Sequence, residues 1–307
     1  MILLDLFRKI FPFAGTNLRL IKNRYRKNFS DKKRRKFVEK EFKKSIGYDL
    51  NWNSLQTYNE KMQREKLYNL YPEKIRCSDK LAVREFVKEK IGEEYLIRIL
   101  GVWDSFDDID FSILPDKFVL KTNNASQTNE FIRNKDDINI QFLKKKFDKW
   151  MKFNYAYKHF EMQYENIKPK IYAEEFLNFK DNIEDYKFLC FNGEPKFCWI
   201  DIDRFNNHKR NVYDLNWNLQ DWNQYTYGNY DKKIERPKNF EGMVKIAKKL
   251  SEGFKHVRVD LYNIDGKIYF GEMTFTNGAG LEIILPEYYN KVLGDFWDID
   301  DKISSGK

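Results

Sequence analysis

This 307-residue sequence has few of the residues that define disulfide-rich, metal-rich or low-complexity proteins. Seven prolines and 14 glycines are too few for a disordered or fibrous chain. The three histidines are too scattered for the ligand spacing of a zinc module. An odd number of cysteines without a C-x-x-C pair argues against a secreted disulfide framework and favours a reducing compartment: Cys77, Cys190 and Cys198.

The chain also has no long hydrophobic run near its start. The opening segment MILLDLFRKIFPFAG is rich in apolar residues, but Asp5, Arg8 and Lys9 interrupt them. This leaves neither a signal-peptide core nor a stretch long enough to span a bilayer. We therefore expect a cytoplasmic protein.

The composition is typical of a folded protein with a large core. Hydrophobic residues make up 42% of the chain and aromatic residues 17%, and the length predicts two lobes. The pattern of helices and strands along the chain is of the mixed α and β type.

The net charge of +9 is concentrated early, in residues 18–44, LRLIKNRYRKNFSDKKRRKFVEKEFKK. Such a run can bind nucleic acid, anionic lipid headgroups or a polyanionic substrate. A solvated helix face without a partner explains the run equally well. Nucleic acid is the weakest of these interpretations, because the sequence has no RNA-binding aromatic signature.

Hydrophobic periodicity and turn residues predict the order of the elements. Short basic helices occupy residues 1–77. The helices and strands expected after them are a helix in 78–92, strands in 95–100 and ending at Lys121, a polar loop at 122–129, a helix in 138–153, a strand in 169–177, a hairpin turned at Asn192-Gly193, a helix in 239–254 and a second hairpin in 257–275.

The second hairpin, VRVDLYNIDGKIYFGEMTF, carries charged residues where a core hairpin would bury hydrocarbon. A two-residue Asp-Gly turn would send Asp260 and Glu272 to opposite faces, because side chains alternate along each strand. A three-residue loop at 264–266 pairs Asn263 with Lys267 and places four polar side chains on one face: Arg258, Asp260, Glu272 and Thr274. That face suits Mg²⁺ carrying a polyphosphate. A solvated hairpin with a surface ion pair is an equal alternative.

Two other segments favour a nucleotide. Lys121 ends a strand just before the loop TNNASQTN, where an ammonium and backbone N–H groups can bind phosphates, although the loop lacks the glycines of a P-loop. IYAEEFL offers Glu174 and the backbone of residues 175–177 to an adenine edge. Taken alone, each segment is explained as well by an ordinary strand end.

The order of these segments resembles the ATP-grasp superfamily, and the sequence is similar to its teichuronopeptide-biosynthesis-like (TupA-like) branch. The resemblance covers residues 75–295 and is strengthened by GVWDSFDDIDFSILPDKFVLK, DYKFLCFNGEPKF and FNNHKRNVYDLNW. It implies an α+β ATP-grasp fold with ATP between two α+β lobes, preceded by a basic helical segment. The regions expected are an N-terminal region at 1–77, a connecting region at 78–116, a small subdomain at 117–177 and a large subdomain at 178–307.

The resemblance also implies roles for individual residues. Mg²⁺ would be held by Asp260, Glu272 and Thr274, with Glu272 bridging two ions. ATP would be bound by Lys80 or Arg84, Lys121, Ser126 in the loop, Glu174, Glu175, Phe176, Leu177 and Lys187. The expected catalytic cations are Arg258, Lys187 and Arg204. An acidic substrate and an amine would meet Asp201, Asp203, Lys209 and Arg210.

The sequence departs from the superfamily pattern in two places. Thr274 stands where many members have Asn, with Asn277 slightly beyond it, so the third metal ligand is open. The loop NNASQTN lacks the usual glycine pairs, so its closed conformation is open as well.

The implied reaction is ligation through an acyl phosphate, in which a carboxylate attacks ATP and an amine then displaces phosphate to give an amide. No nucleophilic Ser or Cys is needed. The branch suggests a sugar acid or glycan and an amino acid or amine as partners in bacterial surface-polysaccharide synthesis. Two alternatives are a glycosyltransferase-like protein and a non-catalytic protein that binds the inner membrane surface or nucleic acid.

Overall fold

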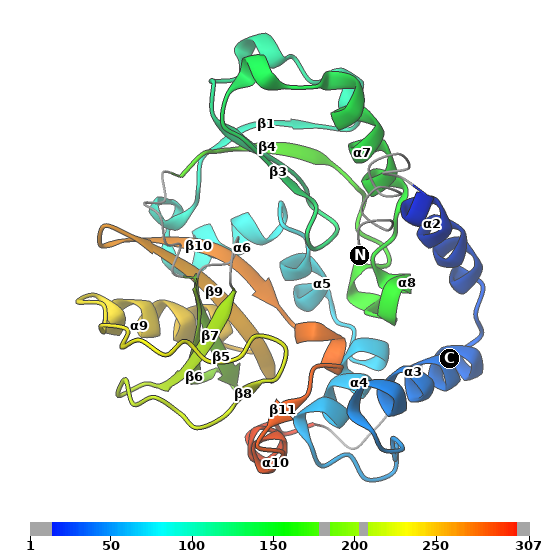
Figure 1. Ribbon diagram of the computed structural model, residues 1–307, viewed down its shortest axis with the longest axis vertical. Coiled ribbons are helices and arrows are strands. Elements are labelled where there is room, and N and C mark those ends of the chain that lie inside the picture. Colours follow the sequence, from blue (N-terminus) through cyan, green and yellow to red (C-terminus); the bar gives the residue numbers. More distant parts are fainter. Residues whose placement is uncertain (1–13, 178–184, 203–207, 300–307) are drawn as a thin grey trace. The chain divides into compact units, whose positions relative to one another are not determined.

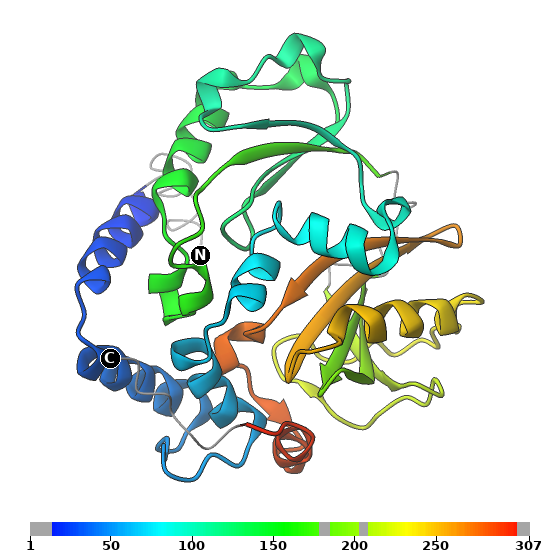
Figure 2. The same cartoon turned by 180° about the vertical axis from the view of Figure 1, so that it is seen from behind.

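The computed structural model describes residues 14–177, 185–202 and 208–299 (Figures 1 and 2). The chain divides into two compact units. Unit 1 comprises Met1–Lys36 and Arg98–Phe176, and unit 2 comprises Phe37–Ile97 and Leu177–Lys307. The division expected from the sequence, at 1–77, 78–116, 117–177 and 178–307, remains a prediction. None of the helices in the described ranges is long and apolar enough to cross a membrane.

Unit 1 is an antiparallel sheet with helices. Its elements are α2 (Ala14–Lys27), β1 (Ile99–Trp103), η2 (Phe106–Asp108), η3 (Phe111–Ile113), β2 (Phe118–Thr122), β3 (Asn129–Ile132), η4 (Lys135–Asp137), α7 (Ile140–Lys152), α8 (Ala156–His159), η5 (Met162–Tyr164) and β4 (Ile171–Glu175). The helix α3 (Asp31–Ile46) crosses from unit 1 to unit 2.

Unit 2 holds the other elements. They are α4 (Tyr58–Tyr68), α5 (Pro72–Ser78), α6 (Val83–Ile91), η1 (Glu93–Tyr95), β5 (Asp185–Phe191), β6 (Glu194–Ile202), β7 (Lys209–Asp214), β8 (Asn223–Gln224), α9 (Phe240–Ser251), β9 (His256–Ile264), β10 (Lys267–Thr274), η6 (Asn277–Gly280), β11 (Ile284–Leu285) and α10 (Tyr288–Asp295).

The sheet of unit 1 has the order β1-β4-β2-β3, and α7 packs on one of its faces. Leu143 and Phe147 of α7 are buried against Phe118 and Leu120 of β2, as the apolar stripe of the sequence predicts. Side chains alternate along a strand, so Lys121, next to Leu120, points to the sheet face opposite α7.

Two strand predictions in unit 1 need correction. A strand was expected at residues 95–100, but the structure has strand β1 at Ile99–Trp103. Its residues pair with residues 171–174 of β4, and this pairing sets where β1 begins and ends. Strand β3 pairs with β2 at the end of the expected loop and in the stretch before the expected helix, where no strand was predicted. Its sequence, NEFI, lacks the alternation of polar and apolar residues that identifies a strand.

The sheet of unit 2 has the order β10-β9-β5-β6-β7, and all its pairs are antiparallel. The predicted turn between β5 and β6 is confirmed. Phe191 pairs with Glu194, and Asn192 and Gly193 adopt φ of 50° and 78°, as a tight hairpin turn requires.

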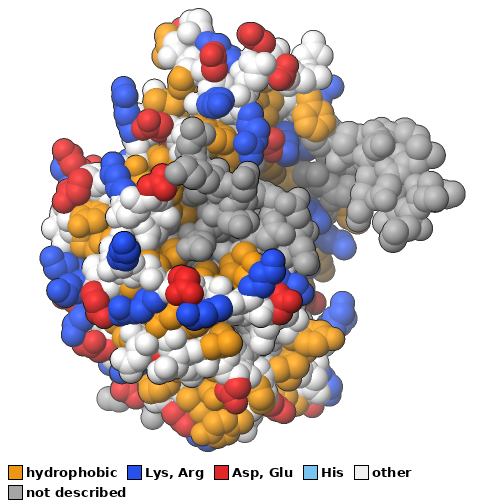
Figure 3. Space-filling model, turned by 60° about the vertical axis from the view of Figure 1, so that its left-hand side comes forward, with side chains coloured by type: hydrophobic (Ala, Val, Ile, Leu, Met, Phe, Trp, Pro, Cys, Tyr) orange, Lys and Arg blue, Asp and Glu red, His pale blue; other side chains and the backbone are white. Residues whose placement is uncertain are grey.

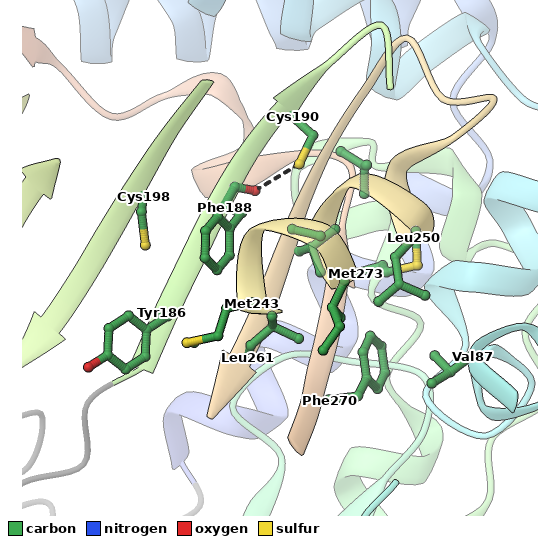
Figure 4. Close-up of a cluster of buried hydrophobic side chains, with 14 of the residues drawn as sticks. Val87, Tyr186, Phe188, Cys190, Cys198, Met243, Leu250, Leu261, Phe270 and Met273 are labelled. Atoms are coloured by element: carbon green, nitrogen blue, oxygen red, sulfur yellow. Dashed lines mark hydrogen bonds between the residues drawn. The ribbon is translucent and has the colours of Figure 1, made fainter. Parts of the chain in front are cut away.

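One face of this sheet is apolar along its length and is covered by α9 and α6. Figure 4 shows Met243 and Leu250 of α9 above Phe188 of β5 and Leu261 of β9. The thiol of Cys190 donates a hydrogen bond to the carbonyl of Phe188, 3.6 Å away. Cys77, Cys190 and Cys198 are all buried and unpaired, in agreement with the absence of a disulfide framework.

The opposite face of the same sheet is divided. One half is apolar and packs against α4 and α10, with Leu189, Phe191, Trp199 and Val212 in a second hydrophobic cluster. The other half carries charged side chains from every strand, although most of them are buried: Asp185, Lys187, Asp201, Arg210, Arg258, Asp260 and Glu272. This charged half contains the candidate site.

Candidate functional site

The hairpin β9–β10 has a shorter turn than expected. Ile264 pairs with Lys267, so Asp265 and Gly266 alone make the turn, and the three-residue loop is wrong. Both turn residues have positive φ, 50° and 87°, which is the requirement of a type I′ turn. This turn matches the right-handed twist of the flanking strands.

A bulge in β10 nevertheless brings the four polar side chains to one face. The register shifts between Phe270 and Glu272, so Gly271 is the extra residue. Beyond the bulge Asp260 pairs with Glu272, and Arg258 pairs with Thr274 instead of Glu272. A Cβ at residue 271 would lie 3.0 Å from the carbonyl oxygen of Asp260, which explains glycine at this position.

Arg258 connects the polar groups of this face. Its Nε and Nη2 donate to the two carboxylate oxygens of Asp260, both at 2.7 Å, and Nη2 also donates to Oε1 of Glu272 at 2.9 Å. Nη2 reaches Thr274 Oγ1 at 3.1 Å, and Nη1 donates to Oδ1 of Asn277. Burial opposes the charge, but the neighbouring acids raise the pKa of Arg258 above its usual value.

Lys187 is surrounded by three aspartates. Its Nζ lies 2.8 Å from Asp260 Oδ2 and 3.7 Å from Asp201 Oδ2, and it also donates to Asp185. Only 5% of the side chain is exposed. Burial alone would lower the pKa of Lys187, but Asp185, Asp260 and Asp201 raise it above the usual value. Lys187 is therefore charged and links β5, β6 and β9.

Glu272 forms the accessible edge of the cluster. Its side chain is 35% exposed, whereas that of Asp260 is 4% exposed. Its Oε1 also accepts from Thr274, and its Oε2 lies 3.9 Å from Nζ of Lys80. Burial would raise the pKa of Glu272, but Lys80, Arg258 and Lys187 lower it to about 2. For Asp260, burial outweighs the two cations and raises the pKa.

A second group of charges lies on β6 and β7. Asp201 pairs in register with Arg210, whose Nε and Nη2 donate to its two carboxylate oxygens at 2.5 and 2.9 Å. Nη1 of Arg210 donates to Gln224, and the guanidinium carbon lies 4.8 Å from the ring centre of Trp199 and 4.2 Å from that of Tyr227. Despite burial, Arg210 and Lys187 hold the pKa of Asp201 well below its usual range.

His208 lies beside this second group. Its Nε2 is 3.3 Å from Oδ1 of Asp201, and its ring lies 4.4 Å from the ring of Tyr227. Lys209 is partly exposed at the start of β7. The predicted substrate residue Asp203 and the predicted catalytic residue Arg204 lie outside the described residues.

Arg84 has a different position from that of Lys80. Its Nη2 donates to the carbonyl of Ile97, 2.6 Å away. Of the two cations proposed for this helix region, Lys80 is therefore the one that the structure of unit 2 brings to Glu272. The role of Arg84 in ATP binding stays a prediction.

In unit 1 two of the predicted nucleotide-binding residues, Lys121 and Glu174, contact each other. Lys121 Nζ lies 2.5 Å from Glu174 Oε2 across the β2–β4 pair. The loop between β2 and β3 is closed by a 2.7 Å hydrogen bond between the hydroxyls of Thr122 and Thr128, and it exposes Ser126. Lys121 and Glu174 share the sheet face opposite α7, but the contact of these residues and of Ser126 with ATP stays a prediction.

Some of the groups at the end of β4 already have partners within unit 1. The N–H of Glu175 donates to the carbonyl of Arg98 at 2.9 Å. The ring of Phe176 packs edge-on against Phe131 and under the guanidinium of Arg133. Leu177 begins the second segment of unit 2. The expected backbone contacts of residues 175 and 177 with an adenine edge remain predictions.

Several residues of the charged face are absent from the predicted set. Asp185 could have been found, because it stands two residues before Lys187 and therefore shares its face of β5. Asn277 was considered only as an alternative metal ligand. No sequence pattern indicated that Gln224 and His208 belong to the site, because the fold and not local spacing brings them to Arg210 and Asp201.

The charged face offers oxygen ligands of the type that Mg²⁺ takes in proteins. Mg²⁺ in nucleotide sites takes one or two carboxylates and completes its shell with phosphate oxygens and water. Asp260 and Glu272 supply two carboxylates on paired strands, and Nδ2 of the buried Asn277, which has no hydrogen-bond partner, can donate to a phosphate oxygen but cannot ligate the ion. Among the described residues no group of three or more His, Cys, Asp or Glu could hold a metal by itself. The residues thus fit an ion shared with a phosphate ligand.

Comparisons with known proteins place the chain in a family. No match was found among curated proteins. Similar solved structures include a D-alanine–D-alanine ligase from Bacillus anthracis complexed with ATP, at 16% identity and a TM-score of 0.40, with 72% of this chain and 63% of that chain covered. An L-amino acid ligase from Bacillus licheniformis matches at 12% identity and 0.42, with 72% and 45% covered.

A third structure is the ATP-grasp ligase PsnB with minimal precursor, Mg and ADP, at 11% identity and 0.38, with 75% and 61% covered. The match thus spans less than two thirds of the length of each of these three chains. The family described as TupA-like ATPgrasp matches residues 60–298, which is most of the sequence. The chain therefore belongs to the TupA-like ATP-grasp family and has its α+β fold.

Proposed function

We propose that the protein is an ATP-dependent carboxylate–amine ligase that forms an amide through an acyl phosphate. Family membership supports an ATP-dependent reaction. One observation supports the charged face of the unit 2 sheet as the place of this reaction. Asp260 and Glu272, on paired strands, are held on one face by the same guanidinium. Two carboxylates in this arrangement are suited to a magnesium ion that carries a nucleotide.

In this proposal Asp260 and Glu272 hold Mg²⁺, with Thr274 and Asn277 as neighbouring polar groups. Bound Mg²⁺–ATP would supply the phosphoryl group that activates the substrate carboxylate. Lys187, Arg258 and Lys80 position the acids, because each lies within 3.9 Å of one of them, and together they lower the pKa of Glu272. Positioning and charge stabilisation are the main contributions that a protein makes to phosphoryl transfer.

The acidic substrate would bind beside β6 and β7. Arg210 already donates to Asp201 and Gln224, so its role there is to position Asp201 rather than to bind a carboxylate. Lys209, which is partly exposed, is a described cation that could bind a substrate acid, and the role of Arg204 stays a prediction. We propose a sugar acid or glycan and an amino acid or amine as partners, in the synthesis of a bacterial surface polysaccharide. We also propose that the protein is cytoplasmic, because the proposed reaction consumes ATP.

The reaction can be tested by product analysis. The protein is incubated with ATP, Mg²⁺ and a panel of uronic-acid nucleotides and amino acids, and ADP and phosphate are measured. We expect release of both only when an acid and an amine are present together. Asp260→Asn and Glu272→Gln should abolish it, whereas Glu235→Gln, a matched change at a side chain that is 81% exposed, should not.

Two outcomes would replace the proposal. Release of a nucleoside diphosphate from the sugar nucleotide, without consumption of ATP, would indicate a glycosyltransferase. Failure of the folded protein to bind ATP at all would indicate a non-catalytic binding protein.

A further inference from the structure

Helix α2 presents a row of hydrophobic side chains to solvent. Leu18, Ile21 and Tyr25 are 53%, 65% and 66% exposed. They are spaced three and four residues apart, so they lie along one face of the helix. Exposed apolar side chains that occur singly need no explanation, but a contiguous row on one helix face marks an interaction surface.

The opposite side of α2 is fixed to the rest of unit 1. Asn23 is 5% exposed; its side-chain Nδ2 donates to the backbone carbonyl of Asn154 at 2.6 Å, and its Oδ1 accepts from the backbone N–H of Asn154. Arg26 donates to the carbonyl of Lys158 at 2.7 Å. These contacts set the rotation of the helix about its axis, so the apolar row is held outward.

Basic residues border the row, and α2 contains no acid. At about 100° per residue, Lys22 and Arg24 lie on opposite sides of the row. Both are exposed, as is Arg19. On the face drawn in Figure 3, by contrast, Lys and Arg side chains are interspersed with Asp and Glu. The first turns of α3 continue the positive charge with the sequence DKKRRK.

We propose that α2 is a membrane-surface helix that binds an anionic lipid bilayer. Leu18, Ile21 and Tyr25 enter the boundary between headgroups and acyl chains, while Lys22 and Arg24 contact lipid phosphates. Interfacial helices have this combination of an apolar row and a basic border, and their binding scales with buried apolar area and with attraction to anionic lipid. The proposal is independent of the ligase function.

The basic residues of α2 favour a bilayer over other partners for the apolar row. A second copy of α2 would bring two basic helices without acids into contact, and their repulsion opposes pairing. Nucleic acid would leave the centre of the surface, which is apolar, without a complementary group, because phosphate contacts dominate such binding. A bilayer with anionic headgroups complements both the row and its border.

A single label can report insertion, since all three natural cysteines are buried. An environment-sensitive dye is attached to Ile21→Cys in the full chain, and the same dye is attached to Ile113→Cys, whose native side chain is 70% exposed in η3. We expect vesicles with a quarter phosphatidylglycerol to shift the emission of the dye at residue 21 to the blue. The dye at residue 113 should not respond, and neutral phosphatidylcholine vesicles should have little effect.

Flotation with the same vesicles measures affinity. The full chain with Lys22→Glu and Arg24→Glu should bind at least about tenfold more weakly, because each basic residue near an anionic surface contributes substantially to binding. Leu18→Gln with Tyr25→Gln should weaken binding similarly, whereas Ile113→Gln should not. Circular dichroism and thermal unfolding of each variant confirm that the fold is retained.

Several results would overturn the proposal. They are equal binding by the charge-reversed and the unchanged protein, an equal response of the two dyes, and no response at residue 21. A blue shift at residue 21 without vesicles would also overturn it. If that shift grew with protein concentration, the row would be an interface between copies. If it did not, a segment of the same chain would cover the row.

Discussion

Arg258 donates one hydrogen bond to Asp260 Oδ2 at 2.7 Å and, from the same nitrogen, one to Glu272 Oε1 at 2.9 Å. A single guanidinium nitrogen thus holds two carboxylates of neighbouring strands together. Without a cation between them, the buried Asp260 and the partly exposed Glu272 would repel each other, which favours protonation of one of them. The guanidinium therefore fixes the positions at which a magnesium ion would find its ligands.

Arg258→Lys should destabilise the protein although the charge is kept. A lysine ammonium cannot reproduce the fork of donors that reaches Asp260, Glu272 and Asn277 at once. We expect the free energy of unfolding to fall by about 1.5–3 kcal/mol, the range for hydrogen bonds to charged groups. Arg76→Lys, at a side chain that is 31% exposed, is the control and should change stability little. Urea denaturation measures both, and equal losses would contradict the account.

Lys187 and Lys80 both approach acids of the site, but their burial differs. Lys187→Met leaves Asp185, Asp201 and Asp260 without their common cation in a buried position. The expected loss is about 3–5 kcal/mol, as for other broken buried ion pairs. Lys80 is 23% exposed and 3.9 Å from Glu272, so Lys80→Met should cost at most about 1 kcal/mol. Chemical denaturation of the two variants would refute this contrast if their stabilities were the same.

The bulge at Gly271 can be tested by adding a side chain there. Gly271→Val places a Cβ 3.0 Å from the carbonyl of Asp260, and the strand must shift to relieve the contact. We expect a loss of about 1–3 kcal/mol, the usual cost of overpacking, and weaker ATP binding because Glu272 moves. In Gly242→Ala, a Cβ would meet Ile268 at an ordinary 3.7 Å, and this helical variant should be at least as stable as the parent.

His256 should make stability depend on pH between pH 5 and 6.5. Burial lowers its pKa to about 3, and in the neutral ring Nδ1 donates to the carbonyl of Cys190 while Nε2 accepts from the hydroxyl of Tyr58. The folded state thus binds its proton less readily than the unfolded state, whose pKa is near 6.5. Stability is fully present above that value and falls as the pH drops towards 3, by up to about 1.4 kcal/mol per pH unit.

The measurement is a series of unfolding curves from pH 7 to pH 5, above the range in which carboxylates titrate. His256→Gln should be less stable at pH 7 and should have a shallower slope. An unchanged slope in His256→Gln would show that another group causes the pH dependence.

The sequence predicted much of this arrangement because strand alternation is a local property. Residue spacing indicated that the second hairpin could place Arg258, Asp260, Glu272 and Thr274 on one face, and they do share it. The turn that places them there was predicted wrongly, since the hairpin has a two-residue turn and a bulge at Gly271 in place of the three-residue loop. A glycine in a strand signals a bulge or a close approach of another chain, and the sequence alone does not distinguish them.

Contacts between distant segments were not predictable in the same way. His208 lies near Asp201 because β6 and β7 pair in one register, and Gln224 reaches Arg210 from a separate short strand. The family resemblance located the acids and the lysines, but not the partners that hold them. The exposed row of α2 was also hidden, because the sequence shows the charge of residues 18–44 but not which face of the helix packs on unit 1.

The most direct test of the central claim is the magnesium dependence of ATP binding, measured by titration calorimetry. The account predicts binding in the presence of Mg²⁺, a large loss when Mg²⁺ is removed with a chelator, and a similar loss in Glu272→Gln, which remains folded. Glu235→Gln should bind as the unchanged protein does. Equal affinity for ATP with and without Mg²⁺, or undiminished affinity in Glu272→Gln, would contradict the claim that Asp260 and Glu272 hold the metal of a nucleotide.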